Sequence, residues 1–324
     1  YDTAAFIGGE TLTDRSTDLS RGFNTYDDQH PWNREDLKRP GVDIAQRATK
    51  WIQNKKKTGQ PYFAFVHFFD AHFPYTPAAP WDTKYNPDYT GTLTGSDADL
   101  MPFRDGTKTP SDADLEQITA LYDGEISELD AIIAPLLDEA NDGNTVIVVT
   151  SDHGESFGHN YWFNHRDGLW DEITNVPLII AGANVPEKKR VGALTGLIDI
   201  MPTILDTLNM TPLVRVNGSS TKGVWNDPIF RPAIFSMTDP TRPKPLLAKR
   251  TLSHKLITTR GKKGEQAEIQ RYNTLSDPKE QDPTAKLTEH FSDIEAEYTA
   301  LVTPVVEKWQ GEVPKTTRKP SPEE

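Results

Sequence analysis

The sequence predicts an α/β fold, with a largely parallel sheet flanked by helices and a smaller α+β subdomain at the C-terminal end. Continuous apolar runs of strand length occur at residues 61–69, 145–150 and 176–182, and helical patterns precede and separate the first two. Strands that are apolar throughout are typical of parallel sheets, whose faces are both covered. After about residue 211, short β-like segments alternate with Pro, Lys and Arg, which indicates the smaller subdomain.

The first helix is predicted over residues 40–56, where Ile44 and Ile52 lie on one face. The run "PYFAFVHFF" at 61–69 then predicts a strand that is buried on both faces. Residues 73–111 are rich in Pro and Asp and show no periodicity, so we expect a long surface excursion. Aromatic residues in such a segment can stack on a sugar, but they more often anchor packing.

A second, longer helix is predicted from the capping signal "SDAD" that begins at Ser111. Pro135 is expected to bend or interrupt the last part of this helix, because it removes a backbone donor. The segment "LIDIMPTILDTLNM" at 197–210 predicts a loop that leads into a helix with Pro202 in its first turn.

Composition and charge exclude several classes of function. The 324 residues carry a formal net charge of −13, and no run of Lys or Arg is longer than "KKK", which argues against a nucleic-acid partner. No stretch approaches the roughly 18 apolar residues that span a bilayer. Cysteine is absent, which removes disulfides, zinc–thiolate sites and a Cys nucleophile from consideration within these residues.

Polar side chains follow two of the predicted strands at the point where each strand ends. Asp70 and His72 come after the first strand, and Asp152 and His153 come after the second. Ligands of open α/β sheets collect beyond the carboxyl ends of the strands, so the two clusters should meet if the strands lie side by side. Asp152 and His153 either form a solvated turn or ligate a divalent cation, for which Gly154 would allow the necessary bend.

Several collinear motifs carry a resemblance to a known family. The segments "YFAFVHFFDAHFPYTP", "SDHGESFG", "NHRDGLWDEITNVPLII" and "LIDIMPTILDTLNM" occur in this order, and "HKLITT" followed by "RYNTLSDPKEQ" comes after them. Together they resemble the sulfatase family of the alkaline phosphatase superfamily. The resemblance implies an alkaline-phosphatase-like sheet, with the distal part of the catalytic domain at 1–210, a C-terminal subdomain at 211–310 and a polar tail at 311–324.

The resemblance also implies roles for individual residues. Asp152 and His153 match half of a metal site, which in the family usually holds Ca²⁺, with Mn²⁺ or Mg²⁺ as alternatives. His72 matches a catalytic histidine that contacts the oxygens of the ester. His165 matches a catalytic, substrate-binding residue beside the leaving-group oxygen, and Arg166 is a weaker candidate for substrate binding there.

Two parts of the family's site are not found in these residues. The C/S-x-P-x-R motif, which yields the formylglycine nucleophile, does not occur in the sequence, and neither does the family's acidic pair from its first strand. In the family both precede the segment that resembles "YDTAAFIGG" here. We therefore expect a divalent-metal sulfuric ester hydrolase that is inactive without an N-terminal fragment of the same protein.

The same residues leave two alternatives open. One is a phosphodiesterase or phosphonate monoester hydrolase on the same scaffold, because sulfate and phosphate esters share tetrahedral geometry. The other is a non-catalytic, truncated remnant. For the leading hypothesis, the resemblance implies a sulfate ester substrate, with a sulfated sugar as a candidate, and a periplasmic or secreted location.

Overall fold

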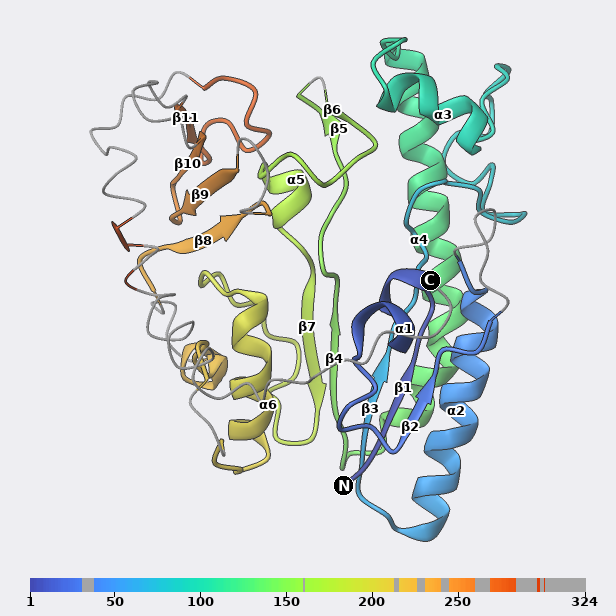
Figure 1. Ribbon diagram of the computed structural model, residues 1–324, viewed down its shortest axis with the longest axis vertical. Coiled ribbons are helices and arrows are strands. Elements are labelled where there is room, and N and C mark those ends of the chain that lie inside the picture. The colour runs from blue at the N-terminus through green and yellow to red at the C-terminus, as the bar shows by residue number, and fades with distance from the viewer. Residues whose placement is uncertain are drawn as a thin grey trace, which may run out of the picture. The chain divides into compact units, whose positions relative to one another are not determined.

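The computed structural model describes residues 1–30, 38–159, 161–212, 216–225, 231–239, 245–259, 269–283, 296–297 and 300. Contacts within the chain divide it into two units (Figure 1). The first comprises Tyr1–Ser151, Glu155–Asn164 and Pro177–Val185, and the second comprises Asp152–Gly154, His165–Val176 and Pro186–Glu324. The domain boundary at 210 stays a prediction, and the tail at 311–324 lies outside the described residues.

A parallel sheet forms the centre of the first unit. Strand β1 (Asp2–Phe6) lies between β2 (Thr25–Asp27) and β3 (Tyr62–Val66), and both neighbours run parallel to it. A short 3₁₀ helix, η1 (Glu10–Leu12), and α1 (Asp14–Thr17) follow β1. The parallel arrangement confirms the predicted fold class.

Strand β3 differs from the prediction in one respect, because it is not buried on both faces. It is the last strand on one side of this sheet, and Phe63 and Phe65 on its outer face are 45% and 40% exposed in this chain. A continuous apolar run indicates that both faces of a strand can be covered, but it does not show whether the covering residues belong to the described part of this chain.

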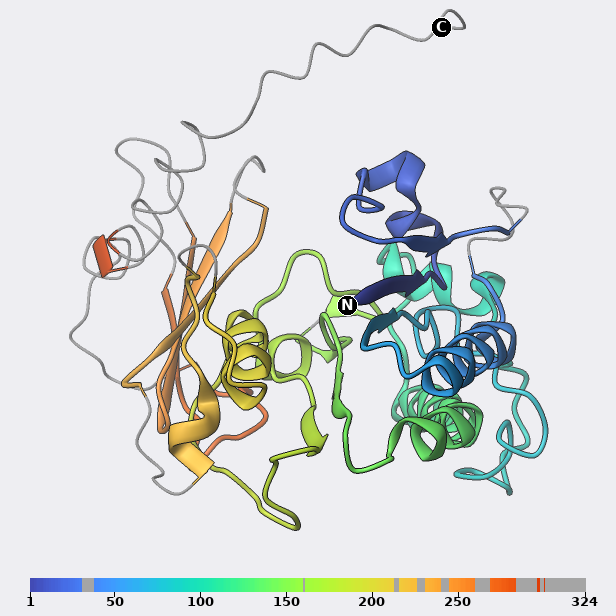
Figure 2. The same cartoon turned by 90° about the horizontal axis from the view of Figure 1, so that it is seen from below.

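Two long helices, α2 (Gly41–Thr58) and α4 (Asp112–Ala140), pack side by side on this sheet (Figure 2). Their shared core contains Ala4, Phe6, Ile44, Ala48, Ile52 and Leu136. The predicted capping box is present, since the Ser111 side chain accepts the Asp114 N–H and the Asp114 carboxylate accepts the Ser111 N–H. Pro135 does not interrupt α4, which continues through it to Ala140, and the next residue, Leu136, packs in the shared core. The predicted bend at Pro135 stays a prediction.

The segment 73–111 is not only a surface excursion. It contains the helix α3 (Asp97–Arg104), and it supplies Phe73, Tyr75, Leu100 and Phe103 to a core cluster that also includes Phe163. Phe73 and Tyr75 are therefore packing anchors, whereas Tyr85 is 49% exposed. The sequence pattern missed this core because its residues come from short, irregular stretches without a period.

The remaining strands of the first unit pair in antiparallel fashion. Strand β4 (Val146–Thr150) pairs with β7 (Leu178–Gly182), and β5 (Phe157–Gly158) pairs with β6 (Tyr161–Trp162). Among the pairings of the described strands, none joins β3 directly to β4. The prediction that β4 and β7 belong to a parallel sheet is thus corrected, because these two strands pair in antiparallel fashion.

The second unit contains short helices and an antiparallel sheet. Its helical segments are α5 (Asp171–Thr174), η2 (Leu197–Asp199), α6 (Ile200–Thr207) and η3 (Thr221–Trp225). The sheet has the order β11-β10-β9-β8, formed by β8 (Ile234–Met237), β9 (Leu246–Arg250), β10 (His254–Thr259) and β11 (Ile269–Asn273). No described helix in either unit combines the length and apolar content that crossing a bilayer requires.

Gly124 in α4 allows the irregular segment before α3 to approach the helix closely. A Cβ atom at this position would lie 2.6 Å from the Trp81 carbonyl oxygen and 2.9 Å from the Pro77 Cγ atom. We expect Gly124→Ala to lower the free energy of unfolding by about 1–3 kcal/mol through overpacking, although alanine is favoured in a helix.

Urea denaturation measures this change. The control is Gly223→Ala, because a Cβ at Gly223 meets nothing within 4 Å. Equal stability of the Gly124→Ala variant and the wild type would contradict the close approach.

Candidate functional site

The carboxyl ends of β1 and β3 lie next to each other, and two glycines make this possible. The His67 N–H donates to the Phe6 carbonyl at 2.9 Å, and the Gly8 N–H donates to the His67 Nδ1 atom at 3.3 Å. A Cβ at Gly9 would lie 2.4 Å from the Phe69 ring. The loop after β3 is therefore fixed against the end of β1, where a parallel sheet positions ligands.

A lysine that precedes α2, Lys38, lies between two carboxylates, one of which, Asp70, belongs to this loop. The Lys38 Nζ atom is 2.9 Å from Asp70 and 3.2 Å from Glu125, and Glu125 also accepts the Thr76 N–H at 2.8 Å. Burial lowers the pKa of Lys38, but the two carboxylates outweigh this and raise it, so the ammonium stays charged. Burial raises the pKa of Glu125, an effect that Lys38 opposes.

The sequence did not single out Lys38, because its partners are distant in sequence. The only local signal was its place in a basic pair with Arg39 before the predicted helix. Arg39 is buried, and it contacts Asp27 at the end of β2 and Asp43 in α2. These ion pairs attach the start of α2 to the carboxyl edge of the sheet.

His72 follows Asp70 in this loop and belongs to the first unit. Its Nδ1 atom lies 2.8 Å from the Phe73 carbonyl oxygen, which can only accept, so Nδ1 carries the proton. The Nε2 atom of the neutral ring is then the one with the lone pair. The Phe69 ring packs against the imidazole with centroids 4.3 Å apart, which fixes its orientation.

Three of the predicted site residues come together in the second unit. The His153 Nε2 atom is 3.6 Å from Asp152 Oδ2, and the His153 and His165 rings stack with centroids 3.8 Å apart and an interplanar angle of 17°. Arg166, the weaker candidate, is exposed in the same segment.

The local geometry of Asp152 and His153 suits a divalent cation. The His153 Nδ1 atom donates to the Gly154 carbonyl at 2.8 Å, so its Nε2 atom carries the lone pair on the side of the Asp152 carboxylate. Asp152 is exposed and so accessible to an ion. Within the described parts of the chain, no three carboxylate or imidazole side chains gather into a complete site, so further ligands would have to be added.

The turn 152–154 is held by α5 rather than by the strand that precedes it. The Gly154 N–H donates to the Ile173 carbonyl at 2.7 Å. A Cβ at Gly154 would lie only 2.1 Å from the Glu172 carbonyl oxygen. The absence of a side chain at this position is therefore what allows the turn to rest on the helix.

Glu155, which follows this turn, has a structural role in the first unit. It is buried and accepts the Tyr75 hydroxyl hydrogen at 2.9 Å. Burial and the neighbouring Glu155 carboxylate raise the pKa of Tyr75, so the phenol remains a donor. The bond anchors the chain after the turn in the aromatic core.

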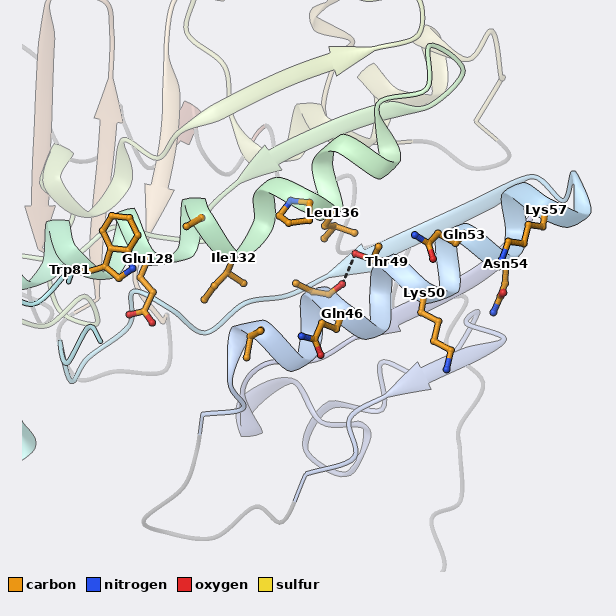
Figure 3. Close-up of a pocket in the computed structure, with 14 residues that line it drawn as sticks. Gln46, Thr49, Lys50, Gln53, Asn54, Lys57, Trp81, Glu128, Ile132 and Leu136 are labelled. Carbon is orange, nitrogen blue, oxygen red and sulfur yellow. Dashed lines mark hydrogen bonds between the residues drawn. The ribbon is translucent and has the colours of Figure 1, made fainter. Parts of the chain in front are cut away.

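A groove of about 780 Å³ in the first unit is lined by residues of α2 and α4 (Figure 3). Ile132 and Leu136 of α4 and Gln46, Lys50 and Gln53 of α2 are among the residues that line it. Its one carboxylate, Glu128, already accepts the Ala78 N–H at 2.8 Å. The groove contains no imidazole or carboxylate pair, so we assign the chemistry to the loops rather than to the groove.

Comparison with known proteins gives a family for this arrangement. Residues 1–210 match the protein-family model described as Sulfatase. Among curated proteins, a sulfatase of Formosa agariphila is 26% identical over 195 residues, which cover 54% of this chain. The chain spans only 38% of that relative's length.

Solved structures show the same fold. A protein in complex with its substrate D-glucosamine-2-N,6-O-disulfate has a TM-score of 0.62 at 19% identity, covering 98% of this chain and 82% of that chain. The phosphonate monoester hydrolase of Agrobacterium radiobacter has a TM-score of 0.59 at 19% identity, covering 96% and 77%. These similarities confirm the alkaline-phosphatase-like fold class predicted from the sequence.

We expect Gly154→Ala to displace the turn 152–154 from α5, because its Cβ would overlap the Glu172 carbonyl oxygen. Overpacking of this kind costs about 1–3 kcal/mol of unfolding free energy, measured by urea denaturation. Gly192→Ala is the matched control, since a Cβ at Gly192 meets nothing within 4 Å. Two variants of equal stability would show that the turn does not rest on α5.

Proposed function

This chain belongs to the sulfatase family of the alkaline phosphatase superfamily, and on that basis we propose that the protein containing it hydrolyses sulfate esters. The observation that carries the proposal is the Asp152, His153 and His165 cluster, which lies within the residues that match the family. A carboxylate oxygen and two imidazoles at one point supply both cation-binding and proton-transfer groups.

The proposed substrate is a sulfated sugar. Support comes from the similar structure that was solved with D-glucosamine-2-N,6-O-disulfate, whose chain is covered to 82%. In hydrolysis of such an ester the bond between sulfur and the sugar oxygen breaks, water supplies the oxygen that completes the sulfate, and the sugar oxygen gains a proton.

The side chains of this chain divide these tasks. His165 donates the proton to the departing sugar oxygen, and the exposed Arg166 is the alternative cation beside it. His72, whose proton is held on Nδ1 by the Phe73 carbonyl, contacts the sulfate oxygens when protonated on Nε2 as well. A divalent cation, Ca²⁺ in the first instance, would be held by Asp152 and His153 and would polarise a sulfate oxygen as a Lewis acid.

The nucleophile is proposed to come from a segment outside these residues. The resemblance assigns it to a formylglycine, accompanied by a further acidic pair for the metal. The outer face and free edge of β3, where Phe63 and Phe65 are exposed, support the addition of a further strand from that segment. On this proposal the isolated chain binds its ligands weakly and does not turn over substrate.

A phosphonate monoester hydrolase is the second candidate, favoured by one observation. The hydrolase from Agrobacterium radiobacter shares the fold over 96% of this chain. The test is to assay the protein extended at its N-terminus with an aryl sulfate, a sulfated glucosamine and a phosphonate monoester in parallel. Faster turnover of the sulfates supports the proposal, preference for the phosphonate reverses it, and no turnover of any substrate indicates a non-catalytic protein.

Replacement of His165 tests its role as proton donor. In the extended protein, His165→Ala should reduce kcat/KM about 10²–10⁴-fold for a sugar sulfate, whose alkoxide leaving group needs a proton. It should have a much smaller effect on an activated aryl sulfate, because the phenolate departs without one. Steady-state kinetics measure both, and equal losses would point to a positioning role.

Metal binding tests the role of Asp152. The 324-residue chain should bind Ca²⁺ or Mn²⁺ weakly by calorimetry, and the extended protein should bind it tightly, because a Ca²⁺ ion takes about 6–8 oxygen ligands. Asp152→Asn should weaken binding to the extended protein, with Asp82→Asn, an exposed carboxylate elsewhere in the chain, as the control. Tight binding by the short chain would contradict the half-site.

A further inference from the structure

Helix α5 supports the candidate site but is too short to maintain its own position. It spans only Asp171–Thr174, and the residue before it, Trp170, provides no side-chain hydrogen bond to cap its N-terminus. Isolated helices shorter than about 12–15 residues are marginal in water. Contacts from outside must therefore determine where the Ile173 carbonyl, and the Gly154 N–H bound to it, are located.

Apolar contacts seat the start of α5 on the antiparallel sheet. Leu169 is buried in a cluster with Ala248, Ile257 and Tyr272. The Trp170 indole N–H donates to the Tyr272 hydroxyl at 3.3 Å. These contacts place the segment between His165 and α5 on the sheet, but apolar packing alone leaves rotation about the helix axis less restricted.

A buried ionic network restricts that rotation. The Lys255 Nζ atom, on a side chain that is 1% exposed, is 2.7 Å from Asp171 Oδ1, 3.1 Å from Thr174 Oγ1 and 3.3 Å from Glu280 Oε1. Glu280 in turn accepts the Asp171 N–H at 2.6 Å, and the Arg250 Nε atom donates to Asp171 Oδ2 at 3.2 Å. The network therefore contacts both the first and the last residue of α5.

Burying this network costs desolvation free energy, so its presence needs a reason other than core packing. Lys255 and Glu280 are almost completely removed from water, and Asp171 and Arg250 are partly buried. Replacement of a buried ionic group by apolar side chains is often neutral or stabilising. Burial raises the pKa of Glu280, and Asp171 adds to this effect while Lys255 opposes it. The charged groups provide directional bonds that restrict the rotation of α5, and an apolar core would lack such bonds.

We propose that Lys255 and Glu280 are positioning residues for the catalytic site, acting through α5 on Asp152, His153 and His165. This inference rests on the proposed function, because it assigns a support to that same site. Lys255 and Glu280 hold the ends of α5, and Ile173 and Glu172 of α5 hold the turn at Gly154. The turn holds the His153 ring against the His165 ring, and His165 lies a few residues before α5 in the sequence.

The test compares two buried lysines of the same sheet. Lys255→Met removes the ammonium from α5, and Lys249→Met removes one from β9 that pairs with Glu297 at 3.1 Å instead. The readout is the ring-proton NMR signals of His153 and His165, which stacking shifts upfield and which His153→Ala and His165→Ala variants assign. We expect both signals to move in Lys255→Met and neither to move in Lys249→Met.

Glu280→Gln provides a second variant, which keeps an oxygen for the Asp171 N–H but loses the charge that faces Lys255. It should also move both histidine signals, and in the extended protein it should lower kcat for a sulfate ester about 10–100-fold with a smaller change in KM. Failure of the wild type to hydrolyse any sulfate ester would refute the proposed function, while the NMR comparison would still decide the present proposal.

Three results would overturn the positioning role. The first is histidine signals that stay unchanged in both Lys255→Met and Glu280→Gln. The second is an equal movement of these signals in Lys249→Met. The third is complete unfolding of both network variants, because the pair would then support the whole unit rather than the site.

Discussion

The hydrogen bond between the Gly154 N–H and the Ile173 carbonyl determines where Asp152 and His153, the proposed cation ligands, lie. Asp152 and His153 follow β4 in the sequence, yet their turn belongs to the unit that contains α5 and the antiparallel sheet. A side chain at Gly154 would prevent this attachment, since its Cβ would meet the Glu172 carbonyl. The position of the candidate metal ligands therefore depends on a helix that is itself held by residues from the end of the chain.

His72 and His153 make the same kind of hydrogen bond to the backbone, although they lie in different units. In His72 and in His153, Nδ1 donates to the carbonyl of the next residue at 2.8 Å. This bond fixes the tautomer, with the proton on Nδ1 and the lone pair on Nε2. His67 shows the opposite arrangement, because its Nδ1 accepts the Gly8 N–H and serves to join two strand ends. The backbone around each ring thus determines which nitrogen carries the proton.

Features that depend on neighbouring residues could be predicted from the sequence, and those that depend on distant residues could not. The period of α2, the cap at Ser111 and the strand character of β3 and β4 are local, and the structure contains them. The antiparallel pairing of β4 with β7 and the exposed face of β3 depend on neighbours in space. Asp152, His153 and His165 were candidates from the sequence, but the stacking of the two histidine rings depends on the fold. Lys255 was not anticipated, because a lysine is expected at the surface unless distant carboxylates pair with it.

The link between Asp171 and Glu280 has a consequence for synthesis on the ribosome. The two residues are 109 positions apart, so α5 and the turn it supports have emerged well before Glu280 is added. At a translation rate of about 5–20 residues per second, roughly 5–20 s pass between the two events. During this interval the histidines lack their final support while the apolar strands before them are already present. The strands β8–β11, on which α5 rests, are also made within this interval, so a chain that ends before Glu280 contains α5 and the turn but lacks the contact that links Asp171 to Glu280.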